Sequence, residues 1–144
     1  MIQKRAVFVD TWGWLALGHH RDSFHGKVQE VFAQMQMNHI PLFSSEYVFD
    51  ELITLLFRRE NYNEAVKFAE NLFAAAGNNE LVIEKVTEQR FYRAWQLRKW
   101  LRDKPHISFT DITSMIIMQD LSISYVLTDD EHFLHVGFGF SKIP

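Results

Sequence analysis

Apolar positions along the chain fall into short continuous runs and longer runs with helical spacing. Residues 5–10, RAVFVD, form a short apolar run that ends in Asp10, and residues 125–127, YVL, form another. Both predict buried strands, because β-branched and aromatic residues suit a packed, pleated surface. Residues 41–43 and the alternating residues 81–86 predict two further strands.

Stretches with apolar residues three or four positions apart separate these strands and predict helices. The amphipathic pattern is strongest after Ser44 and Ser45, either of which can cap the helix that follows, and Thr87 caps a later helix. Breaks at residues 19–23 and 61–63 separate neighbouring helices. The predicted helices span residues 12–17, 25–37, 46–60, 64–76, about 88–103 and 109–121.

Strands that alternate with helices pair in parallel, because a helical crossover returns the chain to the end of the sheet where the previous strand began, and the next strand then runs in the same direction. The sequence therefore predicts an α/β fold, a three-layer α/β/α sandwich with a central, mostly parallel sheet. A length of 144 residues, of which 47% are hydrophobic and 23% charged, fits a single domain spanning residues 1–144. In such sheets, functional sites form beyond the carboxyl ends of the strands.

Composition narrows the chemistry that the chain can perform. There is no cysteine, which excludes disulfides, a thiol nucleophile and thiolate metal ligands. The first apolar run is too short for a signal peptide, and no other run approaches the length of a membrane span, so we expect a cytoplasmic protein with no membrane contact. The net charge of −3 shows no overall basic excess, although an acidic centre and a basic groove would cancel in that sum.

Acidic residues stand where two predicted strands end. Asp10 follows the first strand, and Asp129 and Asp130 follow the strand at residues 125–127. Each has a structural alternative, since Asp10 could cap the next helix and Asp129 could cap a turn. Adjacent acids nevertheless repel one another unless positive charge lies among them.

Two helical positions add acids to this set. Asp111 lies in the first turn of its predicted helix and fits a capping box with Ser108, in which each side chain satisfies a free N–H of the helix start. Asp50 and Glu51 are adjacent in the amphipathic helix over residues 46–60, and helical spacing does not decide which of them faces a site.

Clustered carboxylates offer the oxygen ligands that hard divalent cations prefer. With no cysteine and no H-E-x-x-H motif, a zinc hydrolase is disfavoured. His132 and His135, with acids nearby, form a weaker metal candidate, because no convincing helix carries them.

Four segments in succession resemble the PIN-domain family, and within it the VapC-type toxin ribonucleases. They are FVDTWGWLAL (8–17), SSEYVFDELITLLFRR (44–59), SFTDITSMIIMQDLSI (108–123) and YVLTDDEHF (125–133). These segments keep the family's order and spacing over nearly the whole chain. The resemblance implies a compact α/β/α sandwich that gathers acids from distant parts of the chain around Mg²⁺ or Mn²⁺.

Carried over position by position, the resemblance also assigns individual residues. Of the adjacent acids Asp50 and Glu51, it selects Glu51. It also places the last site acid three residues before a phenylalanine, and counting back from Phe133 selects Asp130. Thr11 and Thr128 are expected to hydrogen-bond the carboxylates or bound water. The implied catalytic and metal-binding acids are Asp10, Glu51, Asp111 and Asp130, with Asp129 as an auxiliary metal ligand.

Two other families that begin with a strand-end aspartate fit the chain less well. A haloacid-dehalogenase-type phosphatase carries a second aspartate two residues later, where this chain has Trp12. A receiver domain needs an acidic pair near its first strand and a lysine late in the fold, and neither is evident.

Residues 85–104 interleave basic and aromatic side chains. Cations that follow a nucleic-acid backbone and aromatic rings that stack on bases are features of single-strand binding. We nevertheless favour a plain amphipathic helix there, with its aromatic rings inward and its cations in water. One to two turns after Glu51, the helix carries two arginines that offer another place for phosphate contacts. The candidate RNA-binding residues are Arg58, Arg59, Arg93 and Arg98.

The expected function is a metal-dependent endoribonuclease that hydrolyses phosphodiester bonds in RNA and acts as the toxin of a toxin–antitoxin pair. The resemblance also implies a small antitoxin protein that blocks the acids, and a homodimer. The alternative is a PIN-like module that binds RNA or protein without cleavage. The presence of all four motif acids favours the enzyme.

Overall fold

Five strands form one parallel sheet in a computed structural model that describes residues 5–144. Residues 1–4, which the predicted domain includes, lie outside the described residues. The order across the sheet is β3-β2-β1-β4-β5, so the first strand lies at the centre. The strands are β1 (Val7–Val9), β2 (Leu42–Ser45), β3 (Val82–Glu84), β4 (Tyr125–Leu127) and β5 (Ser141–Ile143).

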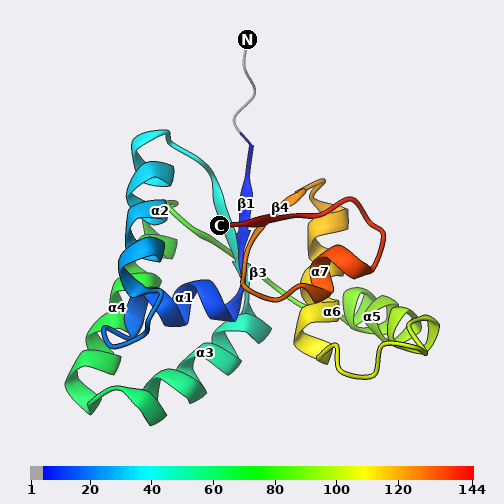
Figure 1. Ribbon diagram of the computed structural model, residues 1–144, viewed down its shortest axis with the longest axis horizontal. Helices are drawn as coiled ribbons and strands as arrows, with labels where there is room; N and C mark the ends of the chain where they lie inside the picture. The colour runs from blue at the N-terminus through cyan, green and yellow to red at the C-terminus, as the bar shows by residue number, and fades with distance from the viewer. Residues whose placement is uncertain (1–4) are drawn as a thin grey trace.

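Helices cover both faces of the sheet and complete the predicted three-layer sandwich, which is confirmed (Figure 1). One face is covered by α1 (Thr11–Gly18), α2 (His25–Met37), α3 (Glu46–Arg59) and α4 (Tyr62–Gly77). The other is covered by α5 (Glu88–Trp100), α6 (Phe109–Asp120) and the short α7 (His132–His135). Within residues 5–144, no helix is both long and apolar enough to cross a membrane.

Several element boundaries differ from those predicted. The turn expected at residues 61–63 is the start of α4, because the Asn61 side chain accepts a hydrogen bond from the Glu64 N–H and caps the helix. Helix α5 ends at Trp100 rather than near residue 103. Strand β1 occupies residues 7–9 of the predicted 5–10.

The C-terminal tail contains two elements that the sequence did not predict, α7 and β5. Its Gly/Phe-rich composition carries no clear period, and Gly137 and Gly139 adopt positive φ angles of 76° and 80°, which only glycine adopts without strain. Strand β5 gains its stability from pairing with β4 and from buried rings, including Phe133 and Phe140. The pairing and the burial both depend on the tertiary structure, so the local sequence does not predict this strand.

The register of the central strands sets the position of the acids. Val9 pairs with Leu127 in the parallel β1–β4 ladder, and the Asp10 N–H donates to the Leu127 carbonyl at 3.1 Å. The residues that follow the two strands therefore emerge side by side at the carboxyl edge. Buried Ser44 supports this edge, because its hydroxyl accepts from Trp14 Nε1 at 3.0 Å and donates to the Val9 carbonyl at 2.9 Å.

Helix α1 lies very close to the sheet just after Asp10. A Cβ at Gly13 would lie 3.0 Å from Leu127 side-chain atoms and 3.0 Å from a Val9 methyl group. Only a residue without a side chain permits this approach, since both neighbours belong to the packed core. Gly13 thereby lets the chain turn from β1 directly into α1.

Gly13→Val should lower the free energy of unfolding by about 2–3 kcal/mol, the usual cost of overpacking a core. Urea denaturation followed by circular dichroism measures this change. Gly26→Ala in α2 is the matched control, because no atom lies within 4 Å of its new Cβ and alanine favours helix by about 0.5–1 kcal/mol. Equal stability of the Gly13 variant and the wild type would contradict the close packing.

Candidate metal centre

Asp10 is buried at the carboxyl end of β1, where its two carboxylate oxygens have different surroundings. Oδ2 accepts a hydrogen bond from the Thr128 hydroxyl at 2.8 Å, and that hydroxyl accepts from the Asp130 N–H at 3.0 Å. Oδ1 has no hydrogen-bond partner, and neither does the buried hydroxyl of Thr11 beside it in sequence. Asp10 does not cap α1 with its side chain, so the capping alternative is wrong.

The surroundings of Asp10 oppose its ionisation. Burial raises the pKa of Asp10 to about 6, against hydrogen bonds from Thr128 and the Thr11 backbone that lower it. The negative charges of Glu51 and Asp130 raise the pKa further. These influences place three acids from β1, α3 and the end of β4 within electrostatic reach of one another.

Asp111 is the second buried acid and comes from the first turn of α6. Its backbone N–H donates to the Ser108 hydroxyl at 3.1 Å, which is the half of the predicted capping box that forms. Among the described residues its carboxyl makes no return bond to Ser108 and instead faces the other acids. Burial raises its pKa to about 9, helped by the charge of Asp10, a hydrogen bond with Asp130 and the charges of Asp130 and Glu51.

Helix α3 contributes one of its two adjacent acids to this cluster. Glu51 is partly buried, and its charge acts on both Asp10 and Asp111. Asp50 is exposed. Of the two adjacent acids, Glu51 is therefore the one whose charge reaches the buried acids.

The two aspartates after β4 differ in exposure, since Asp130 is partly buried and Asp129 is exposed. Asp130 Oδ1 accepts a hydrogen bond from the His132 N–H at 2.9 Å. Asp129 is exposed, and its nearest cation is Lys142 Nζ at 3.9 Å. Asp130 therefore turns into the cluster and Asp129 toward its rim.

His132 joins the acids without His135. Possible ligand atoms of Asp111, Asp130 and His132 lie within 4.8 Å of one another. His132 Nδ1 is 2.9 Å from Asp130 Oδ1 but is not aligned for a hydrogen bond, which leaves the nitrogen without a partner. His135 is exposed on the short helix α7, so the histidine pair does not form a site together. In the sequence, the only sign of this was a histidine two residues after Asp130.

The donor set fits a hard divalent cation. Asp111, Asp130 and His132 offer ligand atoms within 4.8 Å of one another, and the charges of Asp10 and Glu51 act on Asp111. The buried oxygens Asp10 Oδ1 and Thr11 Oγ1 have no hydrogen-bond partner. Buried oxygens without partners are costly, and a cation or its water ligands would satisfy them. Positive charge among the acids would also favour their ionised forms.

A separate apolar cavity of about 710 Å³ lies elsewhere in the fold. It is bounded by α1, α2 and α4 and by the residues that enter β2 and β3, with Trp14 and Leu72 among its lining residues. Since none of the four described acids lines it, the chemical centre is the acidic edge and not this cavity.

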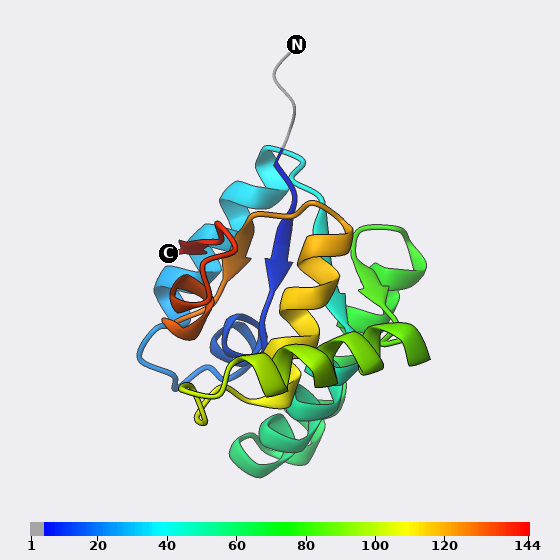
Figure 2. The same cartoon turned by 90° about the vertical axis from the view of Figure 1, so that its right-hand side faces the viewer.

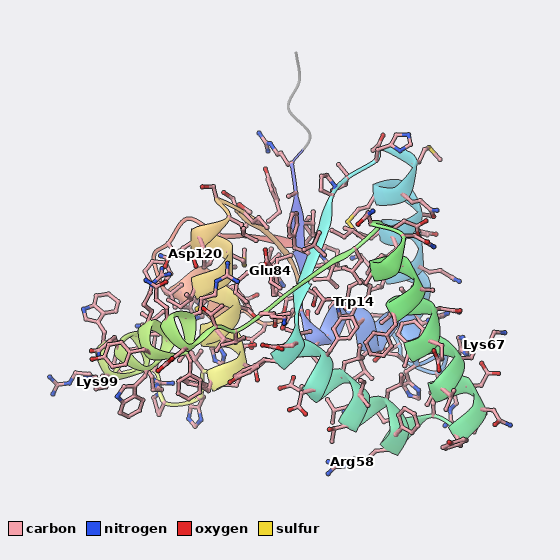
Figure 3. All side chains as sticks on the ribbon, turned by 180° about the vertical axis from the view of Figure 1, so that it is seen from behind. Trp14, Arg58, Lys67, Glu84, Lys99 and Asp120 are labelled. Carbon is pink, nitrogen blue, oxygen red and sulfur yellow. The ribbon has the colours of Figure 1, made fainter. Side chains whose placement is uncertain are left out.

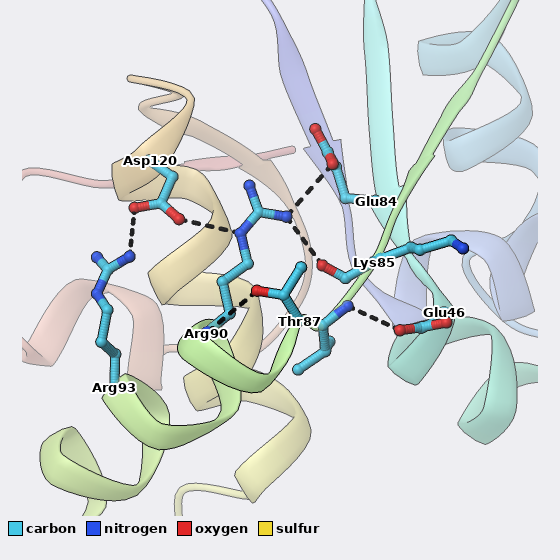
Figure 4. A network of polar contacts seen from close by, with 8 residues as sticks. Glu46, Glu84, Lys85, Thr87, Arg90, Arg93 and Asp120 are labelled. Atoms are coloured by element: carbon cyan, nitrogen blue, oxygen red, sulfur yellow. Dashed lines mark hydrogen bonds and ion pairs between the residues drawn. The ribbon is translucent and has the colours of Figure 1, made fainter.

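The candidate RNA-binding arginines lie in different surroundings. Arg58 and Arg59 are exposed at the end of α3, and Figure 3 shows Arg58 at the tip of the helix pointing away from the sheet. Arg93 Nη1 bonds Asp120 Oδ1 at 2.6 Å, and Arg90 bridges Asp120 and Glu84 (Figure 4).

Arg98 is held by the backbone. Its guanidinium donates to three carbonyls, those of Leu101, Lys104 and Ile107, at 2.6 to 2.8 Å. These bonds close the loop between α5 and α6 and occupy the donors that a phosphate would need.

Helix α5 is oriented opposite to the amphipathic interpretation, which is wrong. Its aromatic rings are exposed, while Arg90 and Arg98 are partly buried among polar partners. The physical reason is that Asp120, Glu84 and the carbonyls after the helix bind the arginines on the side that faces α6. The exposed rings are Phe91, Tyr92, Trp95 and Trp100.

The PIN-domain family model matches residues 7–139, so the chain belongs to the PIN-domain family. Within that family it is similar to VapC toxins, as the sequence predicted. It is 32% identical over 134 residues to the 23S rRNA-specific endonuclease VapC20 of two Mycobacterium tuberculosis strains, with 92% of this chain and 95% of the relative covered. The crystal structure of the M. tuberculosis VapC20, described as a sarcin-ricin loop cleaving toxin, superposes with a TM-score of 0.76 at 31% identity, covering 92% and 96% of the two chains.

The metal-free protein should lose stability as the pH rises from about 4 through 6 toward 9. A carboxyl whose pKa is higher in the folded protein than in the unfolded chain holds its proton better when folded, so acid favours folding and alkali opposes it. Asp111→Asn should flatten this decline and raise the free energy of unfolding at pH 8 by about 1–3 kcal/mol.

Urea denaturation in EDTA at several pH values measures both effects. Asp50→Asn is the control, since this exposed neighbour of Glu51 lies outside the cluster and should leave the decline unchanged. A wild-type protein that becomes more stable between pH 5 and 8 without metal would argue against the crowded acids.

Proposed function

We propose that this protein is a metal-dependent endoribonuclease that hydrolyses phosphodiester bonds in RNA, and that it is the toxin of a toxin–antitoxin pair. One observation carries the proposal. Carboxylates from four separate segments gather at one sheet edge, with two buried oxygens that lack partners, in a chain similar over nearly its full length to an endonuclease toxin.

The resident cation would be Mg²⁺ or Mn²⁺, since the donors are mostly oxygens. When bound, it would supply the positive charge that ionises the acids together and the Lewis acidity that hydrolysis of a phosphodiester requires. The residues that would hold it, directly or through water, are Asp10, Asp111 and Asp130, with Glu51 and Asp129 in support.

The remaining roles belong to the chain's own groups. Thr128 fixes the carboxylate of Asp10 by donating to Oδ2, and Oδ1, which has no partner, would be free to bind the ion. The same hydroxyl accepts from the Asp130 N–H, so one side chain orients two ligands. Glu51 and Asp130 are partly buried, whereas Asp10 and Asp111 are buried. Glu51 would hold the attacking water or accept its proton.

The relatives suggest the partners. VapC20 is named for 23S rRNA and its sarcin-ricin loop, so a ribosomal RNA loop is the first substrate to test here. A small antitoxin would block the acidic edge, and the toxin would work in the cytoplasm as a homodimer. Arg58, Arg59 and Arg93 remain candidate phosphate contacts, whereas the backbone bonds of Arg98 favour a structural role.

Asp10→Asn should reduce RNA cleavage by several orders of magnitude, because it removes a central ligand. The assay incubates a pool of structured RNAs, including a sarcin-ricin loop oligonucleotide, with Mg²⁺, Mn²⁺ or EDTA and separates the products by gel. Asp50→Asn should cleave like the wild type. RNA binding by the wild type without cleavage in either metal would support the non-catalytic PIN-like module instead.

Asp130→Asn and Asp129→Asn should differ in their effect on cleavage. Asp130 faces the cluster and its loss should cost orders of magnitude, whereas exposed Asp129 should cost about tenfold, the lower end for a supporting residue. Single-turnover cleavage at saturating Mn²⁺ measures both, with folding checked by circular dichroism. Equal losses would indicate two equivalent ligands, and the reverse order would overturn the assignment of Asp130.

A further inference from the structure

We infer that the exposed aromatic surface of α5 stacks unpaired bases of the RNA substrate beside the metal centre. The aromatic surface consists of Phe91, Tyr92, Trp95 and Trp100. The inference rests on the proposed function for the choice of RNA, and it adds the surface that binds the unpaired bases of that RNA.

The aromatic surface is unusually exposed for such large rings. The exposed fractions are 47% for Phe91, 62% for Tyr92, 48% for Trp95 and 68% for Trp100. All four belong to one helix of thirteen residues, and several large exposed rings on one helix are typical of a binding surface. The helix buries the small residue Ala94 on its other side, with Leu101 directly after it.

Polar contacts on the inner side hold the rings outward. Arg90 and Arg93 bind Asp120 at the end of α6, and Arg90 also binds Glu84 at the end of β3 (Figure 4). Arg98 is bound by the carbonyls of the following loop. The helix is therefore anchored through its arginines, and its rings form a fixed surface in water.

The charge around the aromatic surface suits a polyanion. Residues 85–106 contain seven Lys and Arg residues and two Asp and Glu residues. Arg90, Arg93, Arg98 and Lys104 are bound within the chain, so the other three cations, Lys85, Lys99 and Arg102, carry the argument. Lys99 Nζ lies 5.9 Å from the centre of the Trp95 ring, and the exposed Arg102 follows. No ion pair among residues 5–144 engages Lys99 or Arg102, so both remain available to phosphates.

The same charge argues against a second copy of the chain as the occupant. A symmetric dimer formed through α5 would bring Lys99 and Arg102 of one protomer toward those of the other, and like charges across an interface weaken association. RNA meets no such penalty, because its phosphates complement the cations and its bases cover the rings.

The aromatic surface adjoins the helix that carries Asp111. The Phe91 ring packs edge-on against Phe109, with ring centres 5.2 Å apart, and Phe109 is the first residue of α6, two positions before Asp111. Figure 2 shows α5 lying across α6 on the outer face of the sheet. A strand whose bases stack on α5 would thus bring its neighbouring phosphates toward the acids.

Duplex RNA keeps its bases stacked internally and would offer nothing to these rings. The surface is therefore suited to a loop, a bulge or an unpaired end. The cations of α5 and its following loop would bind the RNA phosphates, and the exposed rings would stack on its bases. The acids lie next to this surface.

The test measures binding of fluorescein-labelled RNA by anisotropy to the full-length chain carrying Asp10→Asn, which prevents cleavage. The probes are a single-stranded oligonucleotide, the same sequence with abasic nucleotides, and a duplex. Adding Trp95→Ala and Trp100→Ala should weaken binding of the single strand about tenfold or more, since each stacked base contributes about that much. Binding of the abasic and duplex probes should change little.

Tyr62→Ala is the matched control, because Tyr62 is an aromatic residue exposed to 72% at the start of α4 and away from α5. It should bind all three probes like the parent. Circular dichroism confirms that the variants fold, and sedimentation measures their oligomeric state.

Three results would overturn the inference. They are unchanged affinity of the tryptophan variant for the single strand, an equal loss for the abasic probe, and conversion of a dimer to a monomer with RNA affinity intact. The last would make the surface an interface between copies. In the cleavage-competent chain, a tryptophan variant that keeps the wild-type KM would overturn the inference alone, whereas a wild type that cleaves no RNA would overturn the proposed function.

Discussion

The crowding of buried carboxylates at one edge of the sheet is the constraint on which the rest of the structure depends. Asp10 and Asp111 are both removed from water, and each has its pKa raised by burial and by the other acids. Such an arrangement opposes folding unless it is protonated or neutralised by a cation. The surrounding fold must therefore be rigid enough to hold groups that would otherwise move apart.

The rigidity comes from short connections between neighbouring strands and helices. The β1–β4 register puts Asp10 beside Thr128, and the Thr128 hydroxyl then joins Asp10 to the backbone of Asp130. Ser44 ties α1 and β2 to the end of β1 through two buried hydrogen bonds. Since the bonds of Thr128 and the Ser44–Val9 bond lie within two residues of Asp10 or Asp130, the scaffold and the centre are one unit. Changes to Thr128 or Ser44 would therefore alter the centre as well as the stability of the fold.

The sequence was informative wherever function and local structure use the same residues. The central strands are apolar runs that end in acids, and the order of four motifs identified the family and the fold. Contacts between residues far apart in the sequence could not be predicted. The orientation of α5 depends on Asp120, about thirty residues after Arg90, and β5 depends on pairing with β4. An amphipathic pattern ranks aromatic residues as buried, so it fails where arginines find better partners inside than outside.

The electrostatics of an acidic nuclease require that affinity and chemistry be separated in space. Phosphates are repelled by the acids at close range, yet at physiological ionic strength charges more than about 8 Å apart are largely screened. The net charge of −3 therefore says little about whether RNA binds, and the local balance on each surface decides. On this chain the excess of cations lies on α5 and its following loop, while the acids lie at the carboxyl edge beside α6. A cation at the acids would complete the arrangement, since it would replace repulsion by attraction only at the phosphate to be cleaved.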